Sequence, residues 1–426
     1  MSETPSETQF TYQAPPFRFG PGAVDEIWHD LLQLGVRRAL LLTDAGVAAT
    51  GLPERIAQAA GAAGVDVVVY DEVHIEPTDG SIVAAVEFAK ASEWEGFVAV
   101  GGGSVIDTAK AVNLYTSHPA ALMHYVNPPF GDGAPPPGPL KPLVAVPTTA
   151  GTGAESTSVC VLDLLDLRVK TGISHTRLRP TLAVIDPLTT LTLPDEVTAA
   201  TGMDVLGHAI ESYTARPYTS FAAKRPEGRV AYCGANPVSD VWCERAIRLV
   251  GTALRRAVAR GDDTAARTDM MLAATFAGMG FGNAGVHIPH ACAYPIAGNV
   301  RGHVPEGYPG NEPLVPHGQA VAVTTPAAFR FTFEHDPGRH VDVATWLDAD
   351  TAAREPDPRE KLPAVLTDLM REIGIPNGLE ALGYSESDIP TLVDGASKQH
   401  RLLGIAPVDV TDGHLEHVLR ESLTNW

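Results

Sequence analysis

Four side chains in the second half of the sequence have the types and spacing of ligands for one divalent metal ion. Asp204 and His208 are four residues apart in a stretch with helical periodicity, so they share one face of a helix. His290 and His317 each stand near the start of a further predicted helix, among prolines and glycines. One carboxylate and three imidazoles suit Fe(II) or Zn(II) and leave a coordination position open. His287 is an alternative to His290 that spacing alone does not exclude.

A metal with an open position can bind a substrate oxygen and lower its pKa, so that the alkoxide expels hydride to a nicotinamide ring. In the reverse direction the metal polarises a carbonyl group. Phosphoryl transfer is a weaker interpretation, because the Mg²⁺ used for it prefers oxygen ligands to imidazoles.

A glycine-rich segment between a predicted strand and a predicted helix could hold the phosphates of a nucleotide; it consists of Gly101, Gly102, Gly103 and Ser104. Glycines let a pyrophosphate approach the backbone, and the helix N-terminus offers N–H groups and a favourable dipole. Asp107 and Lys110 follow on the first turns of the predicted helix. The alternative to a role in nucleotide binding is that they cap the helix and lie on its solvated face. The GxGxxG fingerprint is absent, so this is not an ordinary Rossmann first turn.

A second glycine-rich loop follows another predicted strand and carries the hydroxyl groups of Thr148, Thr149 and Thr152. Loops at the ends of neighbouring parallel strands face one crevice, where open sheets bind ligands. Asp44, just after the first long strand, could accept hydrogen bonds from a ribose diol, or could cap a helix. A carboxylate there disfavours a 2′-phosphate, so NAD is favoured over NADP.

Hydrophobic patterning divides the chain into an α/β half and a helical half. Short apolar runs at 39–43, 65–70, 96–100, 142–146 and 182–185 alternate with helical stretches, which predicts an open, mostly parallel, doubly wound sheet. Residues 17–22 are expected to form a separate turn or edge hairpin. Apolar residues then follow helical spacing at 195–213, 238–260, 263–280, 317–334, 358–373 and 385–396. We therefore expect an α/β nucleotide-binding domain at 1–190 and an all-α domain at 191–426.

Composition narrows the range of partners. The 426 residues carry a net charge of −20, which disfavours nucleic acid and anionic membranes. The sequence contains no uninterrupted run of about 18 apolar residues, so no membrane span is expected. The acidic N-terminus lacks the pattern of a signal or transit peptide, so a cytoplasmic location is expected.

Taken together, the motifs resemble those of the iron-containing (group III) alcohol dehydrogenases. They are GGGSxxDxxK at 101–110, PTTxGTGxE at 147–155, Asp204 with His208, His290, and PHG at 316–318. Within that family the chain is most similar to the hydroxyacid–oxoacid transhydrogenase branch, through segments 140–149, 211–214, 234–240, 276–287 and 313–318.

The resemblance implies a dehydroquinate synthase-like fold with NAD across the cleft, and a homo-oligomer is expected. It implies His290 in preference to His287, so the metal ligands would be Asp204, His208, His290 and His317. The cofactor contacts it implies are Asp44, Gly101, Gly102, Gly103, Ser104, Asp107, Thr148, Thr149 and Thr152. Many relatives have a second histidine four residues after the His290 position, where this chain has Tyr294.

The expected reaction is oxidation of 4-hydroxybutyrate to succinate semialdehyde, coupled through bound NAD to reduction of 2-oxoglutarate to 2-hydroxyglutarate. An acid substrate needs a cationic anchor. The long loops offer Arg216, Lys224, Arg225, Arg229, Arg301 and His303. The alternatives are an alcohol dehydrogenase that releases NADH, a metal-dependent sugar-phosphate lyase and a non-enzymatic NAD sensor.

Overall fold

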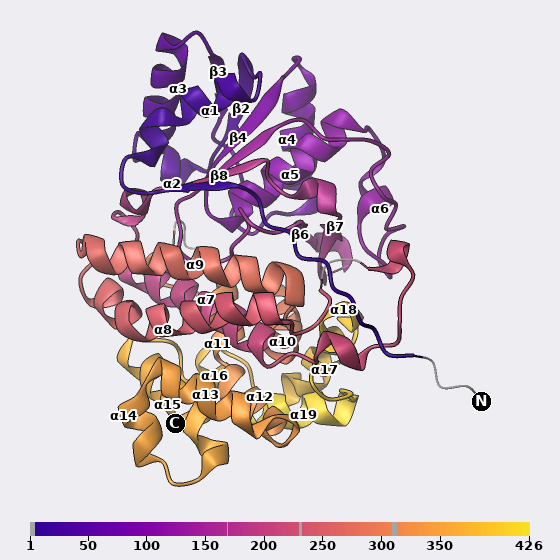
Figure 1. The fold of residues 1–426 in the computed structure, drawn as a ribbon, viewed down its shortest axis with the longest axis vertical. Coiled ribbons are helices and arrows are strands. Elements are labelled where there is room, and N and C mark those ends of the chain that lie inside the picture. The colour runs from indigo at the N-terminus through magenta and orange to yellow at the C-terminus, as the bar shows by residue number, and fades with distance from the viewer. Residues whose placement is uncertain (1–4, 168, 230–231, 309–312) are drawn as a thin grey trace. The chain divides into compact units, whose positions relative to one another are not determined.

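The computed structural model describes residues 5–426 except 168, 230–231 and 309–312, and its internal contacts divide the chain into two units (Figure 1). One unit, Ala14–Thr192, contains the parallel sheet. The other, Met1–Gln13 with Leu193–Trp426, is helical. The N-terminal segment thus groups with the helical unit, whereas residues 1–190 were expected as one domain.

The sheet of the α/β unit has six parallel strands in the order β1-β8-β5-β4-β2-β3. They are β1 (Phe17–Phe19), β2 (Arg38–Leu42), β3 (Asp66–Tyr70), β4 (Gly96–Gly101), β5 (Leu143–Pro147) and β8 (Leu182–Ile185). The expected open parallel sheet is confirmed. The expectation of a separate turn or edge hairpin at 17–22 is right in placing a turn at 20–22 and the segment at the sheet edge, but wrong in the pairing, because Phe17–Phe19 pairs in parallel with β8 and belongs to the main sheet.

Both faces of this sheet are covered by helices. Ala39 and Leu41 of β2 join the core formed with α1 (Ile27–Gln33) and α3 (Leu52–Ala62). Leu40 and Leu42 join the core formed with α4 (Asp79–Lys90) and α5 (Gly103–Ser117). Alternate residues of a strand point to opposite faces, so continuous apolar runs are required where both faces are buried.

The remaining elements of the α/β unit are short. They are α2 (Ala45–Ala48), α6 (Leu122–Tyr125), the antiparallel hairpin of β6 (Val159–Leu164) and β7 (Val169–Ser174), and the 3-10 helices η1 (Ala23–Glu26), η2 (Leu165–Leu167), η3 (Thr176–Leu178) and η4 (Pro187–Thr190).

The helical unit is built around three long helices that run side by side, α7 (Asp195–Tyr213), α8 (Pro237–Ala259) and α9 (Thr264–Ala284) (Figure 1). The further helices are α10 (Ile288–Gly298), α11 (His317–Ala322), α12 (Thr325–Thr332), α13 (Pro337–Leu347), α14 (Ala349–Arg354), α15 (Pro358–Glu372), α16 (Gly378–Ala381), α17 (Ile389–Ser397), α18 (His400–Leu403) and α19 (Asp412–Glu421). Short 3-10 helices are η5 (Tyr218–Ser220), η6 (Pro226–Gly228), η7 (Phe333–His335) and η8 (Glu386–Asp388).

One predicted helix is divided in the structure. Residues 317–334 form α11, α12 and the start of η7 instead of one continuous helix. Pro326 favours the break, because proline lacks an N–H donor and is best accommodated in the first turn of a helix, the position it has in α12. Among the described residues, no helix is both long and apolar enough to cross a membrane.

Candidate functional site

Helix α7 places Asp204 and His208 on one buried face. Their side chains are 3% and 5% exposed, and His208 Nδ1 lies 3.8 Å from Asp204 Oδ2. The His208 ring stacks on Phe281 of α9 with the centroids 3.8 Å apart, which fixes the plane of the imidazole. The predicted spacing therefore brings the two side chains together.

Two glycines let the neighbouring helices approach this face. A Cβ atom on Gly318 would lie 1.9 Å from the Ala200 carbonyl oxygen, so only glycine lets α11 pack this closely on α7. A Cβ atom on Gly207 would lie 2.8 Å from Val321 of α11. This close packing brings His317, the first residue of α11, to Asp204.

Asp204, His290 and His317 offer ligand atoms that all lie within 4.8 Å of one another. Asp204 Oδ1 is 3.5 Å from His290 Nε2 and 3.7 Å from His317 Nε2. Two atoms bound to one ion at tetrahedral angles are about 3.4 Å apart. The spacing fits ligation, and the 22% exposure of His317 leaves one side of the group accessible.

Among the four predicted ligand residues, three atoms are buried without a hydrogen-bond partner: Asp204 Oδ1, His208 Nδ1 and His290 Nε2. An unsatisfied buried polar atom is costly, and such atoms are rare in native structures. A cation among the ligand atoms of Asp204, His290 and His317 would satisfy Asp204 Oδ1 and His290 Nε2. The donor set therefore fits a divalent metal, although His208 lies outside the tightest group of three.

Glu211 is a site residue that the sequence interpretation missed. Its Oε1 atom lies 2.5 Å from His290 Nδ1, and its Oε2 atom accepts from the backbone N–H of His287 at 2.6 Å. The carboxylate is fully buried. The available signal was its spacing, since Glu211 follows Asp204 by seven residues and His208 by three on the same helix.

The carboxylates make the site electrostatically favourable for a cation. Burial alone would lower the pKa of His290, but Glu211 and Asp204 outweigh it and raise that pKa to about 10. Burial opposes ionisation of Asp204, yet the neighbouring histidines hold its pKa well below the usual range. Burial lowers the pKa of His208 to about 3 and so favours a neutral imidazole that can act as a ligand.

His287, the alternative ligand, is engaged elsewhere. Its Nε2 lies 3.1 Å from Thr214 Oγ1, and its Nδ1 accepts from the N–H of Ile288 at the start of α10. Both ring nitrogens therefore have local partners. The geometry favours His290, which the resemblance also implied.

The two glycine-rich loops of the α/β unit lie against each other at the ends of β4 and β5. A Cβ atom on Gly102 would lie 3.3 Å from Thr149 Cγ2, and one on Gly103 would lie 2.7 Å from Thr152 Oγ1. Gly102 is the N-cap of α5. The first turn of a helix leaves its N–H groups without intrahelical partners, as a phosphate site requires.

Ser104 has a specific contact in this region. Its Oγ accepts from the backbone N–H of Glu76 at 3.0 Å, so the hydroxyl proton can be directed to another acceptor. Glu76 itself has a positive φ of 56° and is held through its carboxylate by Lys170 at 2.5 Å. The rare backbone conformation and the ion pair therefore position the donor to Ser104.

Other predicted cofactor contacts already have partners inside the protein. Asp44 Oδ1 accepts from the N–H of Val47 and caps α2. Asp107 receives Lys110 Nζ at 3.0 Å on one oxygen and the N–H of Val161 at 2.9 Å on the other. Lys110 is fully buried, so its interpretation as part of a solvated face is wrong. The place of Asp107 in a cofactor site stays a prediction.

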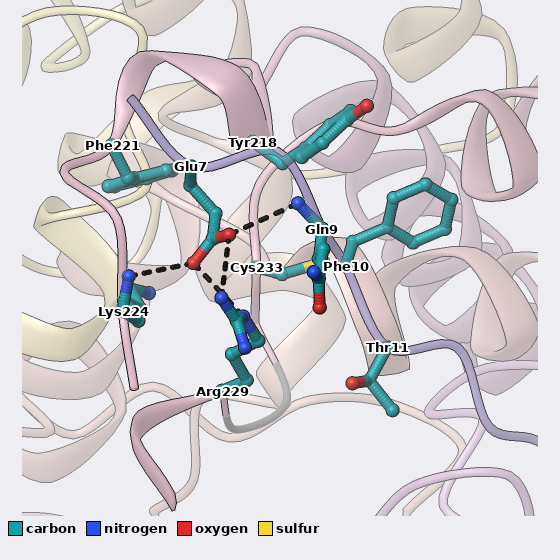
Figure 2. Close-up of a pocket in the computed structure, with 9 residues that line it drawn as sticks. All are labelled: Glu7, Gln9, Phe10, Thr11, Tyr218, Phe221, Lys224, Arg229 and Cys233. Atoms are coloured by element: carbon teal, nitrogen blue, oxygen red, sulfur yellow. Dashed lines mark hydrogen bonds and ion pairs between the residues drawn. The ribbon is translucent and has the colours of Figure 1, made fainter. Parts of the chain in front are cut away.

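Several cations expected at the substrate site form ion pairs within the helical unit. Figure 2 shows the Glu7 carboxylate directed at the Arg229 guanidinium, with Nε and one terminal nitrogen each 3.1 Å from a carboxylate oxygen. The backbone N–H of Lys224 also donates to Glu7. Arg216 pairs with Asp409, and Arg301 pairs with Asp388. His303 instead lies 3.2 Å from Gln319 Oε1, and Arg225 is exposed.

Comparison with known proteins gives two family matches that together span most of the chain. Residues 14–187 match the model described as iron-containing alcohol dehydrogenase, and residues 227–423 match its C-terminal counterpart. The mitochondrial hydroxyacid-oxoacid transhydrogenase of Bos taurus is 44% identical over 429 residues, covering 99% of this chain and 92% of its own length.

Solved structures agree in fold. A 1,3-propanediol oxidoreductase superimposes with a TM-score of 0.85 at 31% identity and covers 97% of this chain and 100% of its own. Sulfoacetaldehyde reductase from Bifidobacterium kashiwanohense, in complex with NAD+, gives a TM-score of 0.80 at 28% identity. The match covers 97% of this chain and 98% of the reductase chain.

The comparisons contradict the expected cytoplasmic location. The relatives from Bos taurus, Mus musculus and Homo sapiens are all named as mitochondrial. The composition of the first residues was insufficient to decide location.

Proposed function

The chain belongs to the iron-containing alcohol dehydrogenase family and is an oxidoreductase, and on this premise we propose that it is a hydroxyacid–oxoacid transhydrogenase. Oxidation of 4-hydroxybutyrate to succinate semialdehyde gives hydride to bound NAD⁺ and releases a proton. Reduction of 2-oxoglutarate to 2-hydroxyglutarate takes up the hydride and a proton, and NAD⁺ is restored. The identity to the named transhydrogenases over almost the whole chain carries this proposal.

Asp204, His208, His290 and His317 would hold the metal, with Fe(II) favoured by the family and Zn(II) as the alternative. Bound there, the ion would act as a Lewis acid on the substrate oxygen. With the ion bound, Glu211 would accept the Nδ1–H of His290 and so leave the Nε2 lone pair for the metal. Phe281 keeps the His208 ring in place and excludes water from one face of it.

Gly101, Gly102, Gly103 and Ser104 would bind the cofactor phosphates, with Thr148, Thr149 and Thr152 on the facing loop. The hydroxyl of Ser104 would donate to a phosphate oxygen, since its acceptor side is used by Glu76. Asp44 would accept from the adenosine ribose with the oxygen that does not cap α2.

The deciding experiment supplies purified enzyme with 4-hydroxybutyrate and 2-oxoglutarate, without free NAD. We expect 2-hydroxyglutarate and succinate semialdehyde in equal amounts and ping-pong kinetics. Asp204→Asn is the inactive control. If no 2-hydroxyglutarate forms without free NAD, but NADH accumulates when NAD⁺ is added, the enzyme is instead a dehydrogenase that releases NADH. The likeness to 1,3-propanediol oxidoreductase favours that second candidate.

A further inference from the structure

The N-terminal segment of the helical unit, residues 5–13, forms a strap along the loop that precedes α8. Its backbone pairs with this loop, since Ser6 makes an isolated antiparallel bridge with Ala222. Figure 2 shows the Glu7 carboxylate, whose side chain is 5% exposed, bound by the Arg229 guanidinium of the same loop. The start of the strap is therefore fastened by both backbone and side-chain contacts.

Asn283 of α9 fastens the other end of the strap. Its Oδ1 accepts from the backbone N–H of Gln13 at 2.8 Å, and its Nδ2 donates to Gln13 O at 3.0 Å. The same nitrogen donates to Met279 O, one turn earlier in α9, at 2.9 Å. Asn283 is only 3% exposed, and its amide supplies the one acceptor and the two donors that these contacts need.

The backbone at the end of α9 is held by the same loop as the strap. The Asn283 carbonyl accepts from the N–H of Cys233 and the Ala284 carbonyl from the N–H of Gly234, both at 2.9 Å. The last carbonyl groups of a helix have no intrahelical partner, so their order depends on contacts of this kind. Gly285, with a φ of 101°, then ends the helix. The strap, the loop and the end of α9 thus form one hydrogen-bonded group.

The end of α9 meets the candidate metal site on both sides of Asn283. Two residues earlier, Phe281 stacks on the His208 ring with the two planes 11° apart. Beyond Asn283, the turn into α10 is bound by Glu211, the carboxylate that lies 2.5 Å from His290 Nδ1. A displacement of Asn283 would therefore be felt at two of the predicted ligands.

We propose that Asn283 is a positioning residue for the metal ligands and that the strap holds it in place. It keeps Phe281 against His208, and it keeps the turn into α10 where His290 can reach the other ligands. Its effect on the metal passes through these side chains. This inference rests on the metal site of the proposed function and gives the N-terminal strap a role in retaining the metal.

The test measures how fast Fe(II) leaves the loaded protein for an excess of chelator, without air and without substrate. In Asn283→Ala we expect release at least about tenfold faster than in the wild type, the lower range for loss of a group that orients metal ligands. Glu7→Ala loosens the start of the strap and should change the rate in the same direction by less. The double variant should release Fe(II) no faster than Asn283→Ala, since both changes act through the strap.

Asn113→Ala is the matched control. Asn113 lies in α5 of the α/β unit, is 2% exposed and makes the same reciprocal pair with one residue, Lys141. Its Nδ2 donates to Lys141 O at 2.8 Å, and its Oδ1 accepts from the Lys141 N–H at 3.2 Å. This variant should lower the melting temperature as Asn283→Ala does, but it should release Fe(II) at the wild-type rate.

Release at the wild-type rate in Asn283→Ala, or equally fast release in Asn113→Ala, would show that the contact only stabilises the fold and would overturn the proposal. If Asn283→Ala does not fold, Glu7→Ala decides in its place, and a wild-type rate there has the same meaning. Failure of transhydrogenation does not affect this assay, which needs only bound metal. A wild type that binds no Fe(II) would instead refute the metal site of the proposed function, and this proposal with it.

Discussion

The carboxylate of Glu211 lies 2.5 Å from Nδ1 of His290, the ring nitrogen that is not directed at Asp204. A carboxylate at Nδ1 fixes the tautomer and orientation of the imidazole and increases the basicity of Nε2. The same carboxylate binds the backbone N–H of His287, so it also fixes the start of α10. Glu211 therefore joins α7 to α10 and prepares His290 as a ligand.

Glu211→Gln is expected to weaken metal binding about 10- to 100-fold, because an amide cannot supply the same charge to the imidazole. The measurement is metal retention against a graded chelator. Glu196→Gln, an exposed change on the same helix, is the control. If Glu211→Gln retained metal as strongly as the wild type, the contact between Glu211 and His290 would have only a structural role.

The four-ligand assignment predicts that His208→Ala and His317→Ala each lower the metal content of purified protein. His287→Asn should keep it, since His287 lies outside the ligand group and asparagine can still cap α10. Elemental analysis of anaerobically purified protein provides the comparison. Wild-type stoichiometry in both alanine variants would refute the assignment.

Gly103→Ala is expected to weaken NAD binding by about tenfold or more, because the added Cβ would lie 2.7 Å from Thr152 Oγ1 and separate the two glycine-rich loops. Fluorescence titration with NADH measures the affinity. Gly80→Ala is the matched control, since its Cβ would meet nothing closer than 3.9 Å at the first turn of α4. Similar affinities in the two variants would argue against the proposed phosphate site.

Arg229→Gln should destabilise the protein at neutral pH and leave the KM for 4-hydroxybutyrate close to the wild-type value. Hydrogen bonds from Arg229 and from the N–H of Lys224 lower the pKa of Glu7 from 4.5 to about 2. A lowered carboxyl pKa gives stability that is complete above about pH 4.5 and is lost as pH falls towards 2. Melting temperatures of wild type and variant should therefore converge over that range. A selective rise in KM would show instead that Arg229 contacts the substrate.

Glu155 should make stability depend on pH in the opposite sense. Burial raises its pKa from 4.5 to about 7. The folded state then binds more protons than the unfolded state between those values, so the free energy of unfolding falls as pH rises across the window. In the wild type, this effect lowers the free energy of unfolding by at most about 3 kcal/mol between pH 5 and pH 8, as measured by denaturant unfolding. Glu155→Gln should abolish this decrease. Equal pH dependence in both proteins would contradict this assignment.

The strands, the long helices and the glycine-rich loops could be predicted because their signals are local. A continuous apolar run such as Leu40–Leu42 is typical of a strand that is buried on both faces. Gly101–Gly103 lie where a strand ends and α5 begins, which the local sequence also indicates. The spacing of Asp204 and His208 needed only helical geometry. The family resemblance was carried by the same local motifs.

Tertiary packing decided the rest of the site. Nothing in the local sequence shows that Glu211 meets His290, 79 residues later, or that Gly318 lets α11 approach α7. The loop cations looked available for a substrate, yet Arg229 binds Glu7, 222 residues away. Periodicity is set by neighbours along the chain, whereas the partner of a charged or ligating side chain depends on which distant segments the core brings together.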